Sequence, residues 1–247
     1  EERRLEKVEM ECAQAYQNSF QTKDREKVRT ATKAFTDATK ARKIFRADFL
    51  GNSDHKYAAA CFYRASLMQK MQYAELDSLV RSYTGMENNN DVRLITQRRD
   101  LMRKVAVGVN VPEINLPDVE GKSFALSSLK GKWVLLDFWA SWCGACRATM
   151  PHLKDIYPEY KKKGVEFFSV SLDDKEENWK KAFKEEALPW IDGSNLLGWK
   201  DPIAKQYAIT GIPFKILIGK DGVIVDKGFA RSGSLEKAMD EYLNKVK

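Results

Sequence analysis

The sequence predicts an all-helical domain over residues 1–106 followed by an α/β domain over residues 107–247, in which helices cover both faces of a mixed sheet. Two observations predict this arrangement. In the first domain, apolar residues recur at the spacing of amphipathic helices. In the second, buried-strand patterns alternate with helical patterns and end in a hairpin, so parallel and antiparallel strand pairs are expected in one sheet.

The composition is that of a globular protein. With 247 residues, 43% of them hydrophobic, the chain is long enough for one large or two modest domains with ordinary cores. No apolar run approaches the roughly 18 residues that a membrane-spanning helix needs, and no signal-peptide pattern opens the chain. Because the first residue is Glu1 and not Met, we expect a processed or trimmed protein whose targeting segment is absent from this sequence.

The net charge of +7 is unevenly distributed. Residues 1–107 hold 21 Lys and Arg against 15 Asp and Glu, which is most of the excess. These charges alternate in sign along helical faces and form no compact basic block with interleaved aromatic residues. We therefore expect a solvated surface and no nucleic-acid partner.

Five helices are expected in the first domain. Their apolar stripes cover residues 5–20, 28–49, 57–71, 76–83 and 91–105. Ser53 or Asp54 is the expected cap of the third helix. Such stripes usually form a core, and a bundle that packs on itself or on the second domain explains them. The alternative is a recognition or dimerisation module, which would make the protein a homodimer through its helical domain.

Two isolated cysteines, Cys12 and Cys61, fall in apolar helical series of the first domain. We expect both to be small core residues, with a disulfide between them as the alternative. A zinc site would require a second close pair of cysteines beside Cys143 and Cys146, and the sequence has none. We expect no metal and no other cofactor.

The elements of the second domain follow a boundary at residues 107–112. They are, in order, a hairpin turn at 121–122, strand 133–139, a helix to about 163, strand 165–172, helix 175–187, a helical turn over 201–208, a hairpin of strands 214–218 and 223–227, and helix 234–246. The first helix of this series contains Pro151 and Pro158, which interrupt its hydrogen bonding.

The stretch that carries chemistry is Ser141-Trp142-Cys143-Gly144-Ala145-Cys146, where a buried strand delivers two cysteines into the first turn of a helix. The unpaired N–H groups and the dipole at a helix start favour a thiolate, the reactive form of cysteine. A spacing of two intervening residues lets the second sulfur reach the first across one turn. Cys143 is therefore the expected attacking thiol, and Cys146 the thiol that resolves the mixed disulfide.

Asp137 is the only charged residue in the buried strand before these cysteines. Burial should raise the pKa of its carboxyl group, because an unpaired buried carboxylate is costly. We expect Asp137 to accept, through a water, the proton that Cys146 loses when it attacks. The alternative is a carboxylate that is neutralised by a nearby lysine such as Lys132.

Three separated segments resemble the thioredoxin superfamily. The run 137–146, DFWASWCGAC, is similar to the thioredoxin active-site segment, and Pro151 stands where that family has a proline in the helix. Gly211-Ile212-Pro213-Phe214 is similar to the loop that contains its cis-proline. The lead-in at residues 109–129 and the long insertion before the proline loop resemble the TlpA-like, redoxin-type branch found in bacterial cell envelopes.

This resemblance implies a thioredoxin-like fold over residues 107–247 and a thiol-disulfide oxidoreductase. It implies that the bond between Ile212 and Pro213 is cis and that an extended substrate segment pairs with the backbone at Ile212. Trp142, Gly144 and Ala145 would form the rim of this substrate groove.

The resemblance also implies partners and a compartment. The expected partners are a disulfide-containing protein substrate and an upstream thiol electron donor, and the expected direction is the reduction of disulfides in exported proteins. The expected location is the periplasm or cell envelope of a bacterium.

Two residues depart from the family pattern. Ala145 stands where the family commonly has proline, which leaves the reduction potential open. Thr149 stands where members of this branch that act in cytochrome c maturation carry a glutamate, which weakens an assignment to that pathway.

Two other functions are compatible with the sequence. One is a thiol peroxidase, because the lead-in at residues 109–129 also resembles redoxins, although residues 140–143 lack the Pro-x-x-x-Thr-x-x-Cys setting of a peroxidatic cysteine. The other is an envelope scaffold whose helical domain binds a partner.

Overall fold

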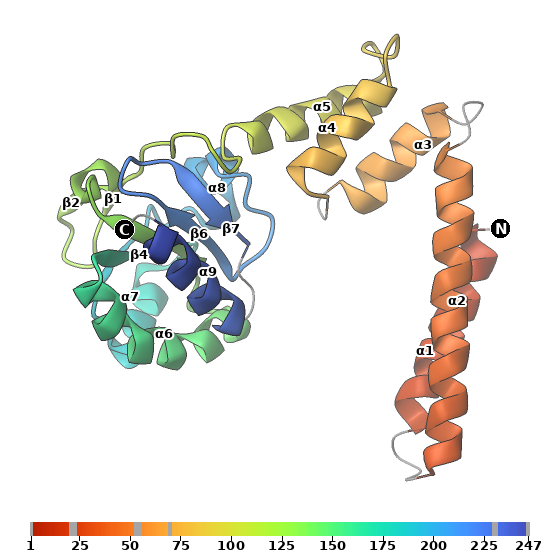
Figure 1. Cartoon of the computed structure of the whole chain (residues 1–247), viewed down its shortest axis with the longest axis horizontal. Helices are drawn as coiled ribbons and strands as arrows, with labels where there is room; N and C mark the ends of the chain where they lie inside the picture. Colours follow the sequence, from red (N-terminus) through yellow and green to blue (C-terminus); the bar gives the residue numbers. More distant parts are fainter. Residues whose placement is uncertain (1, 20–23, 52–55, 69–70, 229–231, 246–247) are drawn as a thin grey trace. The chain divides into compact units, whose positions relative to one another are not determined.

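The computed structural model describes residues 2–19, 24–51, 56–68, 71–228 and 232–245 (Figure 1). Its residues group into two compact units, one formed by Glu1–Lys70 with Arg81–Ile95 and the other by Met71–Val80 with Thr96–Lys247. The domain division after residue 106 stays a prediction. Among the described residues, no helix combines the length and the apolar character that crossing a bilayer requires.

The first unit begins with an antiparallel pair of helices, α1 (Glu2–Ser19) and α2 (Arg25–Gly51) (Figure 1). Arg42 of α2 forms ion pairs with Glu6 and Glu9 of α1, at N–O distances of 3.0 and 2.7 Å. Toward the other end of the pair, the rings of Tyr16 and Phe35 stack with centroids 5.7 Å apart. Tyr16 and Phe35, one residue from each predicted apolar stripe, therefore face each other, whereas Val8 of the first stripe is 39% exposed.

Three further helices complete the predicted set of five. They are α3 (Lys56–Phe62), which continues as a π-helical turn (Tyr63–Leu67), α4 (Tyr73–Ser82) and α5 (Asn90–Arg103). The side chain of Asn89 caps α5 by accepting hydrogen bonds from the backbone N–H groups of Asp91 and Val92. The expected helix cap at Ser53 or Asp54 lies outside the described residues.

The two isolated cysteines differ from expectation. Cys12 and Cys61 are both free, so no disulfide joins them. Cys12 is half-buried, but Cys61 is exposed, and its assignment to the core is wrong. Its neighbours Ala59 and Ala60 are the buried residues of that helix turn. An alanine-rich run shows that one helix face is buried without showing which face.

The second unit contains a two-stranded hairpin and a five-stranded sheet. The hairpin pairs β1 (Asn115–Pro117) with β2 (Ser123–Ala125) around the predicted turn. The sheet has the strand order β5-β4-β3-β6-β7, with these strands at Ile191–Gly193, Val165–Ser171, Trp133–Trp139, Phe214–Ile218 and Ile224–Lys227. Strands β3, β4 and β5 are parallel, whereas β6 and β7 run antiparallel to their neighbours. The predicted mixed sheet is confirmed.

Helices accompany the sheet in the predicted order (Figure 1). They are α6 (Gly144–Lys162), α7 (Glu176–Glu186), α8 (Pro202–Gln206) and α9 (Ser232–Lys245). All seven residues of the central strand β3 are buried. Since alternate side chains of a strand point to opposite faces, both faces of the sheet are covered.

The last part of α5 belongs to the second unit. Arg98 Nη1 donates a hydrogen bond of 2.9 Å to the carbonyl oxygen of Ala208. Lys227 Nζ donates one of 2.8 Å to the carbonyl oxygen of Val105. Burial, together with the charge of Arg98, lowers the pKa of Lys227. These bonds join the end of α5 to the segments around the sheet.

Candidate active site

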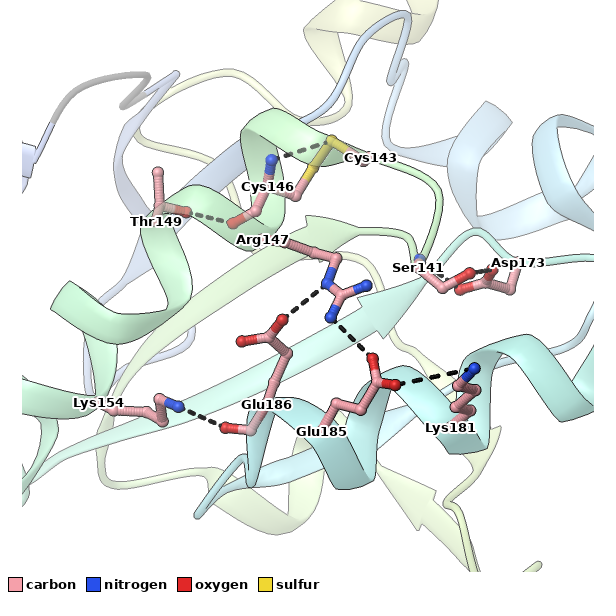
Figure 2. A network of polar contacts seen from close by, with 10 residues as sticks. All are labelled: Ser141, Cys143, Cys146, Arg147, Thr149, Lys154, Asp173, Lys181, Glu185 and Glu186. Carbon is pink, nitrogen blue, oxygen red and sulfur yellow. Dashed lines mark hydrogen bonds and ion pairs between the residues drawn. A yellow bond between two sulfur atoms is a disulfide. The ribbon is translucent and has the colours of Figure 1, made fainter.

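The two cysteines lie where the sequence predicted them, in the turn from β3 into α6 (Figure 2). A disulfide joins Cys143 and Cys146, with an S–S distance of 2.02 Å and Cα atoms 5.2 Å apart. Cys143 is the N-cap of α6, and its sulfur accepts a hydrogen bond of 3.1 Å from the backbone N–H of Cys146. A helix N-terminus thus donates to the sulfur that we expect to become a thiolate.

The two sulfur-bearing residues differ in exposure. Cys143 is 7% exposed and Cys146 is fully buried. Trp142, Gly144 and Ala145, the predicted rim residues, are all exposed around them. Cys143 therefore retains a little contact with solvent, whereas Cys146 has none.

Arg147 follows the cysteines on α6, but its guanidinium group forms ion pairs with α7 (Figure 2). Its guanidinium group pairs with Glu186 at 2.7 Å and with Glu185 at 2.9 Å, both at the end of α7. These carboxylates offset the positive charge of Arg147. The helix terminus is therefore the main source of stabilisation for a thiolate at Cys143.

Asp137 is 4% exposed and forms a buried ion pair with Lys215 of β6, whose Nζ lies 3.1 Å from Oδ1. Burial raises the pKa of Asp137, and the charge of Lys215 opposes this shift. The lysine beside Asp137 is not Lys132, which pairs with Glu166 at 3.5 Å. The sequence signal for Lys215 was a lone charge in the apolar strand FKILI.

Asp137 belongs to a polar row that crosses four strands. It lies directly opposite Lys215 on β6 and Ser169 on β4, and Ser169 lies opposite Asp192 on β5. All four side chains are buried. Residues opposite one another on adjacent strands point to the same face of a sheet, so the row lies on one face.

Asp192, at the end of this row, accepts hydrogen bonds from two indole N–H groups. Trp139 Nε1 lies 2.7 Å from Oδ1 and Trp179 Nε1 lies 2.5 Å from Oδ2. Burial raises the pKa of Asp192 to about 8, helped by the charges of Asp137 and Asp173 and opposed by the two indoles. The sequence reasoning missed this carboxyl group because its partners are distant in sequence.

Asp173 fixes the loop that precedes the cysteines (Figure 2). Its carboxylate accepts hydrogen bonds from the backbone N–H and hydroxyl of Ser141 and from the hydroxyl of Ser171. Asp173 is 1% exposed. The carboxylate therefore holds the residue two positions before Cys143, a role that the sequence analysis did not identify.

The predicted cis bond between Ile212 and Pro213 is present. Ile212 packs against the hydrophobic core that contains Cys143 and Cys146. Among the residues that the structure describes, none exchanges a backbone hydrogen bond with Ile212. Its backbone is available to a further extended segment.

Thr149 stands where some members of the TlpA-like branch carry a glutamate. Its hydroxyl donates a hydrogen bond of 2.8 Å to the carbonyl oxygen of Cys146 (Figure 2). This bond stays within α6 and brings no carboxylate to the cysteines.

The sequence and the fold of this chain are similar to those of known oxidoreductases. Residues 107–227 match the AhpC/TSA family. The chain is 34% identical over 147 residues to a thiol-disulfide oxidoreductase ResA of Bacillus cereus, and the match covers 58% of this chain and 80% of that protein.

Two solved structures are similar to part of this chain. The C-terminal domain of a thiol-disulfide oxidoreductase from Bacteroides thetaiotaomicron is 33% identical, with a TM-score of 0.54, over 57% of this chain and 99% of that chain. The thioredoxin domain of a thiol-disulfide oxidoreductase from Bacteroides vulgatus is 35% identical, with a TM-score of 0.53, over 56% of this chain and 98% of that chain. The chain thus belongs to the thioredoxin-like thiol-disulfide oxidoreductases.

Proposed function

We propose that this oxidoreductase reduces disulfide bonds in exported proteins, with Cys143 as the attacking thiolate and Cys146 as the resolving thiol. The observation that carries the proposal is the asymmetry of the pair. Cys143 caps α6 and retains 7% exposure, whereas Cys146 is fully buried behind it. Cys143 is thus the residue that both lies at the helix terminus and retains some exposure, which supports its role as the attacking thiolate.

The reaction starts from the reduced pair. The Cys143 thiolate attacks one sulfur of the substrate disulfide, forms a mixed disulfide and releases the other sulfur, which takes up a proton. Cys146 then loses its proton and attacks the sulfur of Cys143, which releases the second substrate thiol and leaves the disulfide seen in the structure. Two electrons pass to the substrate, and a dithiol donor upstream must return two electrons.

Asp137 is proposed as the base for the second step, acting through a water. Its burial raises the pKa of the carboxyl group, which makes its carboxylate a stronger proton acceptor than an exposed one. The charge of Lys215 opposes this shift, because it favours the ionised carboxylate that a base requires. The pair combines the two alternatives that the sequence left open, a base and a carboxylate with a lysine partner.

The substrate groove is proposed to run between the rim residues Trp142, Gly144 and Ala145 and the loop at Ile212 and Pro213. The exposed rim supports this, as does the unpaired backbone of Ile212. An extended substrate segment would add main-chain hydrogen bonds at Ile212 while its cysteine meets Cys143.

The proposed compartment is the periplasm or cell envelope, supported by the resemblance to TlpA-like proteins. Apocytochrome c is a narrower substrate, which the hydroxyl at Thr149 does not favour.

We also propose a homodimer that forms through the helical domain. The observation that supports it is the exposure of the apolar side chains of α1 and α2. Among the side chains described there, no apolar one is fully buried. Light scattering on the full chain would reveal a dimer.

Turnover of a protein disulfide tests the proposal. With dithiothreitol as the donor, the purified protein should accelerate the reduction of the interchain disulfides of insulin, and Cys143→Ser should fall to the uncatalysed rate. If the protein consumes hydrogen peroxide faster than it reduces insulin, the thiol peroxidase alternative gains and this proposal fails.

A further inference from the structure

Exposed apolar side chains gather beside the reactive cysteine. Trp142, Leu197 and Trp199 are 53%, 48% and 46% exposed, and all three line one groove. Within the described part of the second unit, only Leu101 and Val107 are other large apolar residues of similar exposure. Exposed apolar area that is concentrated in this way marks a binding surface.

Two segments form the walls of the groove, and Asp173 holds both. One wall is Trp142, whose neighbour Ser141 is bonded to the Asp173 carboxylate. The other wall is the segment 196–200, in which the backbone N–H of Gly198 donates a bond of 3.3 Å to the carbonyl oxygen of Asp173. The groove is therefore in place before a substrate arrives, which lowers the entropic cost of binding.

The second wall adopts an unfavourable backbone conformation. Leu196 has φ +57°, in the left-handed region that disfavours residues with a Cβ atom. Ser194 supports the turn, because its hydroxyl donates to the carbonyl oxygen of Ser171 at 2.9 Å and accepts from the N–H of Leu196 at 3.1 Å. Strain that the surrounding structure maintains is typical of ligand-binding segments.

The chemistry of the groove defines its occupant. The rings of Trp142 and Trp199 lie with their centroids 6.2 Å apart, inclined at 50°, and the buried side chain of Leu172 also lines the groove. The rim carries one charge of each sign, Asp174 and Lys200. Such a surface favours an uncharged aromatic or apolar side chain.

We infer that the groove between Trp142 and the segment 196–200 binds an aromatic or apolar side chain of the substrate polypeptide, next to the cysteine that Cys143 attacks. This inference rests on the proposed reduction of protein disulfides and adds a preference among substrates. Trp142 adjoins Cys143, so a side chain in the groove would position its own neighbouring cysteine at the reactive sulfur.

Two synthetic peptides test the preference. Each has one intramolecular disulfide, and they differ only in carrying Phe or Ser on both sides of each cysteine. The wild-type protein should reduce the Phe peptide with a kcat/KM roughly 10-fold higher than that of the Ser peptide. Trp199→Ala should bring the ratio close to one, and Leu197→Ser should lower it as a second variant. Because each ratio compares two peptides on one protein, a general loss of activity cancels.

The control variant is Leu101→Ala, which removes an exposed apolar side chain outside the groove and should keep the wild-type ratio. A Phe peptide with serines in place of its cysteines should inhibit the wild-type protein competitively. The same peptide should inhibit the Trp199→Ala variant only weakly.

Equal kcat/KM values for the two peptides in the wild type, or an unchanged ratio in both groove variants, would reject the groove and leave the reductase activity standing. If the wild type reduces neither peptide nor insulin, the proposed function fails, and the groove inference fails with it.

Discussion

Lys215 Nζ lies 3.1 Å from Asp137 Oδ1, and the two residues face each other across the antiparallel pair β3 and β6. Both side chains are buried, at 3% and 4% exposure. The fold thus places a fixed positive charge against the carboxyl group that is proposed to take the proton of Cys146. Such a charge favours the ionised carboxylate, whereas burial favours the protonated acid.

Lys215→Met should shift the pH dependence of the resolution step. Lys215 lowers the pKa of Asp137, so its removal raises that pKa further and leaves the base protonated up to a higher pH. The rising limb of the plot of rate against pH should therefore shift to higher pH. The measurement is the release of glutathione from the Cys143 mixed disulfide at a series of pH values. Lys132→Met, which removes a lysine paired with Glu166, is the control and should leave the limb in place.

Asp137→Asn should slow the same release at neutral pH by about 100-fold, the lower range for the loss of a general base. The attack of Cys143 on a small disulfide should change far less, since that step needs no proton from Cys146. Stopped-flow measurements of the two steps separate them. Equal slowing of both steps would assign Asp137 to the stability of the site instead of to proton transfer.

Asp192→Asn should change the pH dependence of stability. Because the pKa of Asp192 is raised from 3.8 to about 8, the folded state keeps a proton that the unfolded state has lost between these pH values. The contribution of this group to stability therefore falls as pH rises through that window. In urea unfolding, the free energy of unfolding of the variant should rise relative to that of the wild type between pH 5 and pH 8. The exposed Asp155→Asn is the control and should show no such trend.

Asp173→Ala should destabilise the fold and loosen the loop before the cysteines. It leaves donors of Ser141 and Ser171 without their acceptor, which costs about 2 kcal/mol or more in the free energy of unfolding. Urea unfolding measures the loss. The neighbouring exposed residue provides the control Asp174→Ala, which should cost less than half as much. A similar loss in both variants would mean that the bonds to Asp173 are not what stabilises the loop.

Much of the second unit could be predicted because its signals are local. The apolar run ending at Trp139, the two cysteines after it and the turn before β7 each lie within a few residues. A strand buried on both faces needs no information beyond its own composition. The likeness of residues 211–214 to the proline loop of thioredoxins predicted the cis bond at Pro213, which the dipeptide alone does not specify.

The missing part of the site depends on strand register and on loops brought together by folding. Lys215 meets Asp137 only because β6 aligns with β3, 78 positions earlier in the chain. Asp173 binds Ser141 across 32 residues. The groove wall at Trp199 depends on the left-handed backbone conformation of Leu196. Glycine is the residue from which this conformation is usually predicted, and this position has leucine. The first two are long-range relationships and the third is a local backbone conformation, and hydrophobic periodicity contains information on none of them.

The most direct test of the central claim is to trap the mixed disulfide. Reduced Cys146→Ser is incubated with oxidised insulin, and the covalent adduct is measured by mass spectrometry, with Cys143→Ser treated in the same way. The account predicts that Cys146→Ser accumulates an adduct linked through Cys143 and that Cys143→Ser forms none. Adducts on Cys143→Ser through Cys146, or no adduct on either variant, would contradict it.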